Sequence, residues 1–183
     1  YIPGTTLKGF IRTALGYSAV ADNAAIRTNI KSGDDVRRLF RLGNDDPTRD
    51  IMRCLTVRDS SSADGDSSLC LAKVKTHSLS RSGEMPAKHW SNGVEAIMPG
   101  TTLSTELIVD VTELEGMIDR FGHEKKVDAL FGSTRKPSAI YNRISEAVDR
   151  FTTAIMAEER RLTEEFGDVE DFFEELDNDA IHC

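Results

Sequence analysis

Residues 2–15 read IPGTTLKGFIRTAL, and no other stretch of the chain says as much about its structure. Pro3-Gly4 is a turn signal, because proline fixes φ and glycine tolerates backbone conformations closed to other residues. Thr5 or Thr6 can then cap a helix by accepting hydrogen bonds from the free N–H groups of its first turn. Apolar residues follow at helical spacing: Leu7, Phe10, Ile11, Ala14 and Leu15. The stretch therefore predicts an amphipathic helix directly after the turn.

The same helix carries groups that suit phosphate binding. Its N-terminus offers free N–H donors and the positive end of the helix dipole, and Thr5 and Thr6 add hydroxyl donors. Lys8 and Arg12 are four residues apart, so both project from one helix face, which we expect to be exposed. Gly9 lies between them and lets a backbone come close. Together these groups can hold successive phosphates of a single strand without reading bases.

Two other interpretations of this helix compete with the binding of a single nucleic-acid strand. One is an ordinary capped helix with two exposed basic residues. The other is a nucleotide-binding P-loop, which the order of residues excludes: in GTTLKG (residues 4–9) the lysine precedes the second glycine, whereas a P-loop needs the lysine after it.

The rest of the chain mixes helix and strand signals. Helices are predicted at 34–42, with Val36, Leu39 and Phe40 inward, at 112–122 behind a Thr112/Glu115 capping box, and from Pro137 to about 162. Strands are predicted at 51–57, 69–79 and 103–111, and a polar loop at 59–68. The order indicates an α+β fold. We expect residues 1–111 to form the core and 112–183 a helical, acidic portion packed on it.

Charge is distributed unevenly along the 183 residues. The formal net charge is −8, but residues 1–100 carry 14 Lys/Arg against 11 Asp/Glu, whereas residues 101–183 carry 9 against 20. A nucleic-acid contact is therefore expected from the N-terminal half.

Several site types find no support in the sequence. The three cysteines (Cys54, Cys70 and Cys183) form no CxxC pair, and the four histidines are scattered, so no zinc site or disulfide framework is predicted. No nucleophile–base arrangement can be argued from spacing, and no apolar run approaches the length of a membrane span. We expect a cytoplasmic protein with no cofactor, no metal and no catalytic residue.

Four motifs, in order, resemble a known family. The stretch at residues 2–15 resembles the signature helix of the RAMP superfamily of CRISPR proteins, and its RTAL ending is similar to that of the fifth, capping subunits of type III-A Csm complexes. Similar segments are DIMRCLTVRDS (residues 50–60), MPGTT (98–102) and FTTAIMAEE (151–159). The first motif by itself is common to the whole superfamily.

The resemblance implies a ferredoxin-like (RRM-type) core that grips CRISPR guide RNA beside a backbone RAMP subunit. It implies that the protein caps the Csm complex near the guide 3′ end, helps guide maturation and in some systems recruits host nucleases. Carried over, it places Thr6, Lys8, Gly9 and Arg12 against guide phosphates; Thr5 and Arg53 complete the predicted RNA-binding set. From the resemblance we expect the first core strand to precede Ile2 and the C-terminal half of the family's pattern to lie outside these 183 residues.

Alternatives remain open at this point. A backbone RAMP subunit with metal-dependent ribonuclease activity would need an upstream aspartate, and a phosphoester-processing enzyme would use the Asp59 loop. That loop, with Asp64 and Asp66, can also be a solvated turn. Trp90 can stack on a base or be buried, and the arginines of 37–41 can extend an RNA track or form ion pairs.

Overall fold

The computed structural model describes residues 1–44, 46–77 and 87–163. The chain divides into two compact units. The larger consists of residues 3–59 together with the chain from 105 onward, and the smaller of residues 1–2 and 60–104. The described helices after residue 111 share one core with the first helix.

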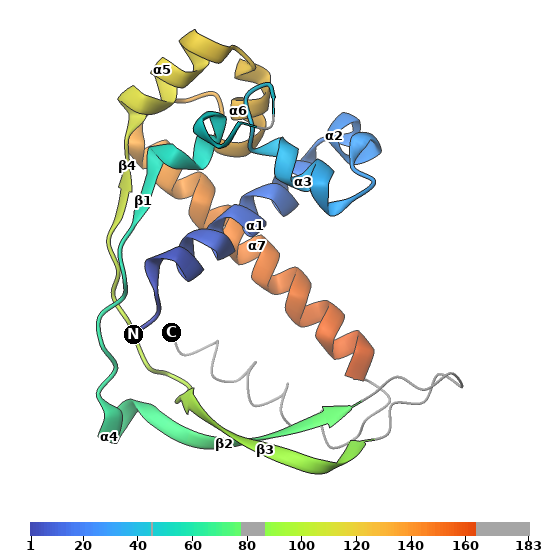
Figure 1. Ribbon diagram of the computed structural model, residues 1–183, viewed down its shortest axis with the longest axis vertical. Helices are drawn as coiled ribbons and strands as arrows, with labels where there is room; N and C mark the ends of the chain where they lie inside the picture. Colours follow the sequence, from blue (N-terminus) through green and yellow to red (C-terminus); the bar gives the residue numbers. More distant parts are fainter. Residues whose placement is uncertain (45, 78–86, 164–183) are drawn as a thin grey trace. The chain divides into compact units, whose positions relative to one another are not determined.

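The larger unit is mostly helical (Figure 1). Its helices are α1 (Gly4–Asp22), α2 (Ala24–Asn29), α3 (Gly33–Leu39), α5 (Val111–Phe121), α6 (Glu124–Phe131) and α7 (Pro137–Thr163). Two 3₁₀ turns, η1 (Pro47–Arg49) and η2 (Ile51–Cys54), precede β1 (Leu55–Val57). β1 pairs antiparallel with β4 (Leu107–Val109), with Leu55 opposite Val109.

The smaller unit is a two-stranded antiparallel ribbon. A short helix, α4 (Gly65–Ser68), leads into β2 (Leu69–His77), which pairs with β3 (Ala87–Ile97). The described strands therefore form two separate two-stranded sheets. The described residues of the larger unit contain six α-helices beside one of these sheets, so the class is α+β, as predicted. Trp90 lies in β3, but its side chain is outside the described residues.

One apolar core holds the larger unit together. Its buried residues come from every described α-helix of that unit except α2, and from η2, β1 and β4. Its largest fully buried side chains are Leu15, Phe40, Leu42, Ile51, Leu55, Leu114, Val127, Leu130, Phe131 and Ile140. Burying such a set removes apolar surface from water and is the main force that packs these helices.

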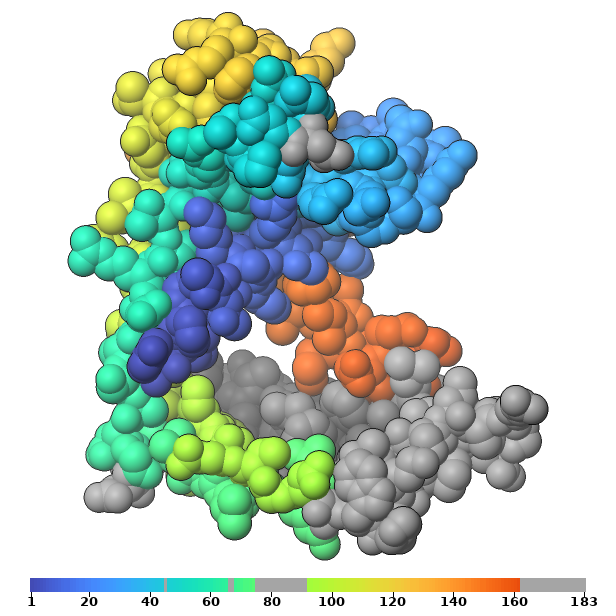
Figure 2. All heavy atoms as spheres, in the orientation of Figure 1, coloured from blue at the N-terminus to red at the C-terminus, as the bar shows by residue number. Residues whose placement is uncertain are grey.

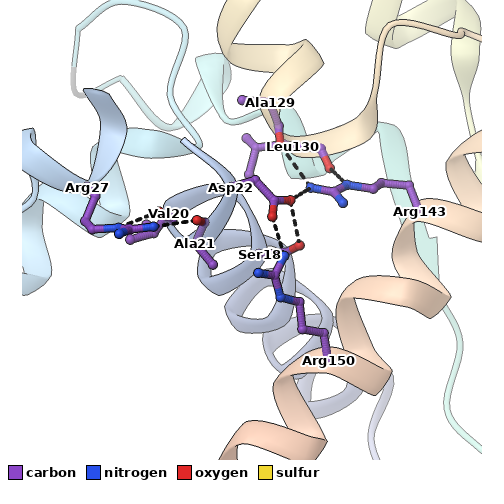
Figure 3. A network of polar contacts seen from close by, with 9 residues as sticks. All are labelled: Ser18, Val20, Ala21, Asp22, Arg27, Ala129, Leu130, Arg143 and Arg150. Carbon is purple, nitrogen blue, oxygen red and sulfur yellow. Dashed lines mark hydrogen bonds and ion pairs between the residues drawn. The ribbon is translucent and has the colours of Figure 1, made fainter. Parts of the chain in front are cut away.

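A charged cluster at the end of α1 ties it to α7 (Figure 3). The Asp22 carboxylate accepts hydrogen bonds from Arg150 and, at 3.1 Å, from Arg143. Arg143 also donates to the carbonyls of Ala129 and Leu130 at the end of α6. The hydrogen bond from Arg150, assisted by Arg143, lowers the pKa of Asp22 below its usual 3.8. This cluster links α1, α6 and α7 through side chains that the core does not use.

Several local predictions need correction. Residues 51–54 form a 3₁₀ turn and not a strand, because the Asp50 side chain accepts from the Met52 N–H and caps that turn. Helix α5 is capped by Asp110 and not by Thr112, since Asp110 accepts from the Glu113 N–H. Val36 was expected inward and is 38% exposed. The predicted start of α7 at Pro137 is confirmed.

No helix among the described residues is both long and apolar enough to cross a membrane.

Candidate nucleic-acid interface

The N-terminus of α1 is capped by a distant carboxylate. Pro3 occupies the N-cap position and no side chain of the first turn caps the helix, so the prediction that Thr5 or Thr6 does so is wrong. Instead the Gly4 N–H donates to Asp59 Oδ1 at 2.7 Å. A negative charge there is stabilising because it faces the positive end of the helix dipole. The end of α1 therefore already holds an anion, supplied by the protein itself.

Gly4 is required by close packing at this point. A Cβ at residue 4 would lie 2.2 Å from the Val57 carbonyl oxygen and 2.8 Å from the Arg58 carbonyl carbon. Only a residue without a side chain lets the end of β1 pass this close to α1. The glycine of the IPG motif thus has a structural role that does not depend on any ligand.

A groove of about 370 Å³ runs beside the first turn of α1. Its lining residues come from α1 on one side and from η2 and β1 on the other: Gly4, Thr5, Lys8, Arg53, Leu55, Thr56 and Val57. Lys8 Nζ donates to the Leu55 carbonyl at 2.6 Å, and Arg53 Nη1 donates to the Thr48 carbonyl at 3.2 Å. Arg53 and Thr5 are both exposed, so a cation and a hydroxyl line this groove.

Arg12 lies elsewhere and is half-buried. Its guanidinium donates to Asp50 Oδ2 at 2.8 Å and stacks over the Phe40 ring at 4.3 Å. The prediction that Lys8 and Arg12 lie on an exposed helix face is therefore wrong, because the segment from Asp50 to Leu55 packs on that face. In this structure Arg12 holds that segment against α1.

The predicted RNA-binding residues thus separate into three groups. Thr5, Lys8 and Arg53 meet in the groove. Thr6 and Gly9 are exposed on α1 beyond its lining. Arg12 is engaged in the ion pair with Asp50. Thr56 also lines the groove and was not predicted, because no local signal links a strand residue to a helix about fifty positions earlier.

Asp59 and Cys54 are the two groups to examine for metal-binding or nucleophilic chemistry in the described part of the chain. No group of three or more His, Cys, Asp or Glu side chains is placed there to hold a metal ion. Asp59, a candidate for such chemistry, is engaged as the cap of α1. Burial raises the pKa of the Cys54 thiol to about 12, so it stays protonated and is a poor nucleophile.

Comparison with known proteins decides the family. The model of the RAMP superfamily matches residues 1–179, nearly the whole chain. The chain belongs to the RAMP superfamily. As a RAMP protein, it is similar in structure to a crystal structure of Csm5 from T. onnurineus, with 25% sequence identity and a TM-score of 0.65.

The extent of that likeness is unequal for the two chains. The match covers 97% of this RAMP chain and 58% of the Csm5 chain, so the chain spans somewhat more than half the length of Csm5. A search of curated proteins finds no match. The resemblance to the superfamily and to its Csm5-like branch, inferred from four short motifs, is confirmed.

Proposed function

We propose that this RAMP protein is a guide-RNA-binding structural subunit of a type III-A CRISPR interference (Csm) complex. In this role it caps the complex near the guide 3′ end, aids guide maturation, and contacts the adjacent backbone RAMP subunit in the cytoplasm. Host nucleases are further partners in this proposal. The likeness to Csm5 over 97% of the chain supports membership of such a complex.

The groove beside α1 is the observation that carries the RNA-binding part of the proposal. It brings Arg53, Lys8 and the Thr5 hydroxyl to one place from two segments about fifty residues apart. An arginine fork and a hydroxyl are donors suited to phosphate oxygens, and their contacts carry no base preference. A protein that binds guides of any sequence needs this kind of contact.

We propose a non-catalytic role for this subunit. Asp59 is the aspartate nearest the groove that was considered for metal-dependent chemistry, and its hydrogen bond to Gly4 gives it a structural function. The competing proposal, a ribonuclease subunit of the same superfamily, predicts Mg²⁺-dependent cutting of bound RNA.

The test is salt-dependent binding of a labelled single-stranded guide RNA to the wild-type protein and to Arg53→Ala. Arg53 is the variant of choice because it is exposed, whereas Lys8 also holds β1 and its removal would disturb the fold. We expect weaker binding and a slope of log K against log[salt] that is shallower by about 0.7–1.

Arg120→Ala on α5 is the matched control, since it removes the same charge from an exposed residue outside the groove. If both variants lose the same RNA affinity, the proposal that RNA binds specifically in the groove is refuted. Cleavage of the RNA on adding Mg²⁺ would refute the non-catalytic role.

A further inference from the structure

The exposed surface of α1 continues beyond the groove without a charge. From the first turn to Tyr17, the exposed residues of this helix are Thr5, Thr6, Gly9, Phe10, Thr13 and Tyr17. Lys8 and Arg12 face the other way, toward the segment around Asp50 and Leu55. Figure 2 shows α1 at the surface, with part of α7 visible beyond it. A neutral path of hydroxyls and a glycine therefore leads around the helix from the groove.

The path ends on a cluster of three aromatic rings. Phe10 and Tyr17 are seven residues apart, two helical turns, so they lie on one face of α1. The Phe151 ring of α7 lies between them, with centroids 5.6 Å from Phe10 and 5.5 Å from Tyr17. Phe10 is 41% exposed and Tyr17 is 40% exposed. Phe151 contacts both rings in tilted geometry, so the partly exposed Phe10 and Tyr17 are each packed against a ring of α7.

The helix surface between the groove and the rings leaves room for an RNA strand to approach closely. A Cβ added at Gly9 would meet no atom within 4 Å, so the space above this residue is open. The groove and the rings lie on different sides of one α-helix, which with its side chains is about 10–12 Å across. A single strand with its phosphates in the groove can thus carry its next bases over Gly9 to the rings.

We propose that Phe10 and Tyr17, backed by Phe151, form a stacking platform for unpaired bases of a single RNA strand. This inference rests on the proposed function, whose phosphate groove lies at the other end of the same path. Aromatic rings can stack on any base, because every base has a π-face. Such stacking tolerates any sequence, as a guide-binding subunit requires. The uncharged exposed face of α1 leads from the groove that contains Arg53 to these rings, and this favours RNA over a protein partner as the occupant.

The test replaces each ring by an aliphatic side chain, in Phe10→Leu and Tyr17→Leu, and measures binding of a single-stranded oligoribonucleotide over a salt series. We expect the affinity to fall by about 5- to 150-fold for a ring that stacks a base. The salt slope should stay unchanged, because no charge is removed. Arg53→Ala should show the opposite pattern, a shallower slope.

A second probe isolates stacking from other effects. An oligonucleotide of the same length with abasic positions keeps the phosphates and loses the bases, so both leucine variants should bind it as well as wild type does. Val36→Ala, which alters a side chain 38% exposed on α3, serves as the apolar control and should leave binding unchanged.

Three results would overturn the inference in distinguishable ways. If the leucine variants bind base-containing RNA with wild-type affinity and Arg53→Ala binds it more weakly, the stacking platform is refuted and the phosphate groove is not. Leucine variants that bind RNA normally but no longer join a neighbouring Csm subunit would show that the rings contact protein. A wild-type protein that binds no RNA would refute the proposed function as well.

Discussion

Replacing Gly4 by alanine should destabilise this protein, because the space at that position is already filled by backbone. The added methyl group would lie 2.2 Å from the Val57 carbonyl oxygen, more than 1 Å inside the 3.4 Å at which ordinary contact begins. The neighbouring atoms of Arg58 are backbone too, so no side chain can rotate away. β1 must move, and the Gly4 N–H then separates from Asp59.

The expected cost follows from these two effects. Overpacking of a tight contact costs about 1–3 kcal/mol, and a weakened helix cap about 0.5–2 kcal/mol. We expect Gly4→Ala to lower the free energy of unfolding by about 2–4 kcal/mol. For a chain of this size that is a fall in Tm of roughly 4–16 °C.

Gly9→Ala is the matched control within the same helix. A Cβ at residue 9 meets nothing within 4 Å, so the substitution adds helix propensity without a clash. It should raise the free energy of unfolding by about 0.5–1 kcal/mol. Urea and thermal unfolding followed by far-UV circular dichroism measure both variants. A Gly4→Ala variant as stable as wild type would refute the close approach of β1 to α1.

Substitution of two carboxylates gives further predictions. Asp59→Ala should lower the free energy of unfolding by about 1 kcal/mol, because it removes the cap on Gly4. Asp59→Asn keeps an oxygen acceptor and should stay within about 0.5 kcal/mol of wild type, so equal losses of stability in thermal unfolding would argue against capping. Asp22→Asn should cost about 0.5–1 kcal/mol at pH 7, because it weakens the pairs with Arg143 and Arg150 on a partly exposed surface. Since the pKa of Asp22 is lowered in the folded state, this difference should persist down to about pH 4 and vanish as the carboxyl protonates at lower pH. Urea unfolding at pH 7 and at pH values below 3.8 checks this, and a difference that does not shrink as the pH falls would contradict it.

The long helices were predictable because their signals are local. Helix α1 follows a run of apolar residues at helical spacing, and α7 follows a proline that suits a first helical turn. The short helices α2 and α6 were not predicted, whereas α3, of similar length, was. Helix α2 buries none of its residues, so it carries no apolar stripe that periodicity could reveal.

The boundary between β4 and α5 shows where local rules stop working. Asp110 and Thr112 are both good N-caps, so capping chemistry cannot choose between them. The pairing of Leu55 with Val109 ends the strand at Val109 and leaves Asp110 free to cap. The choice is made by a partner more than fifty residues away.

The family and the α+β class follow from short motifs and periodic patterns, which a chain carries in its sequence before it folds. The groove, the cap on α1 and the ion pair of Arg12 could not be inferred in this way. Their partners lie 47, 55 and 38 residues apart for Lys8 with Leu55, Gly4 with Asp59 and Arg12 with Asp50. Helical spacing places Lys8 and Arg12 on one face, but only tertiary packing determines whether water or another segment covers that face. Burial of the residues around Ile51 and Leu55 brings their segment onto α1, and this packing converts a predicted basic surface into a structural contact with a groove beside it.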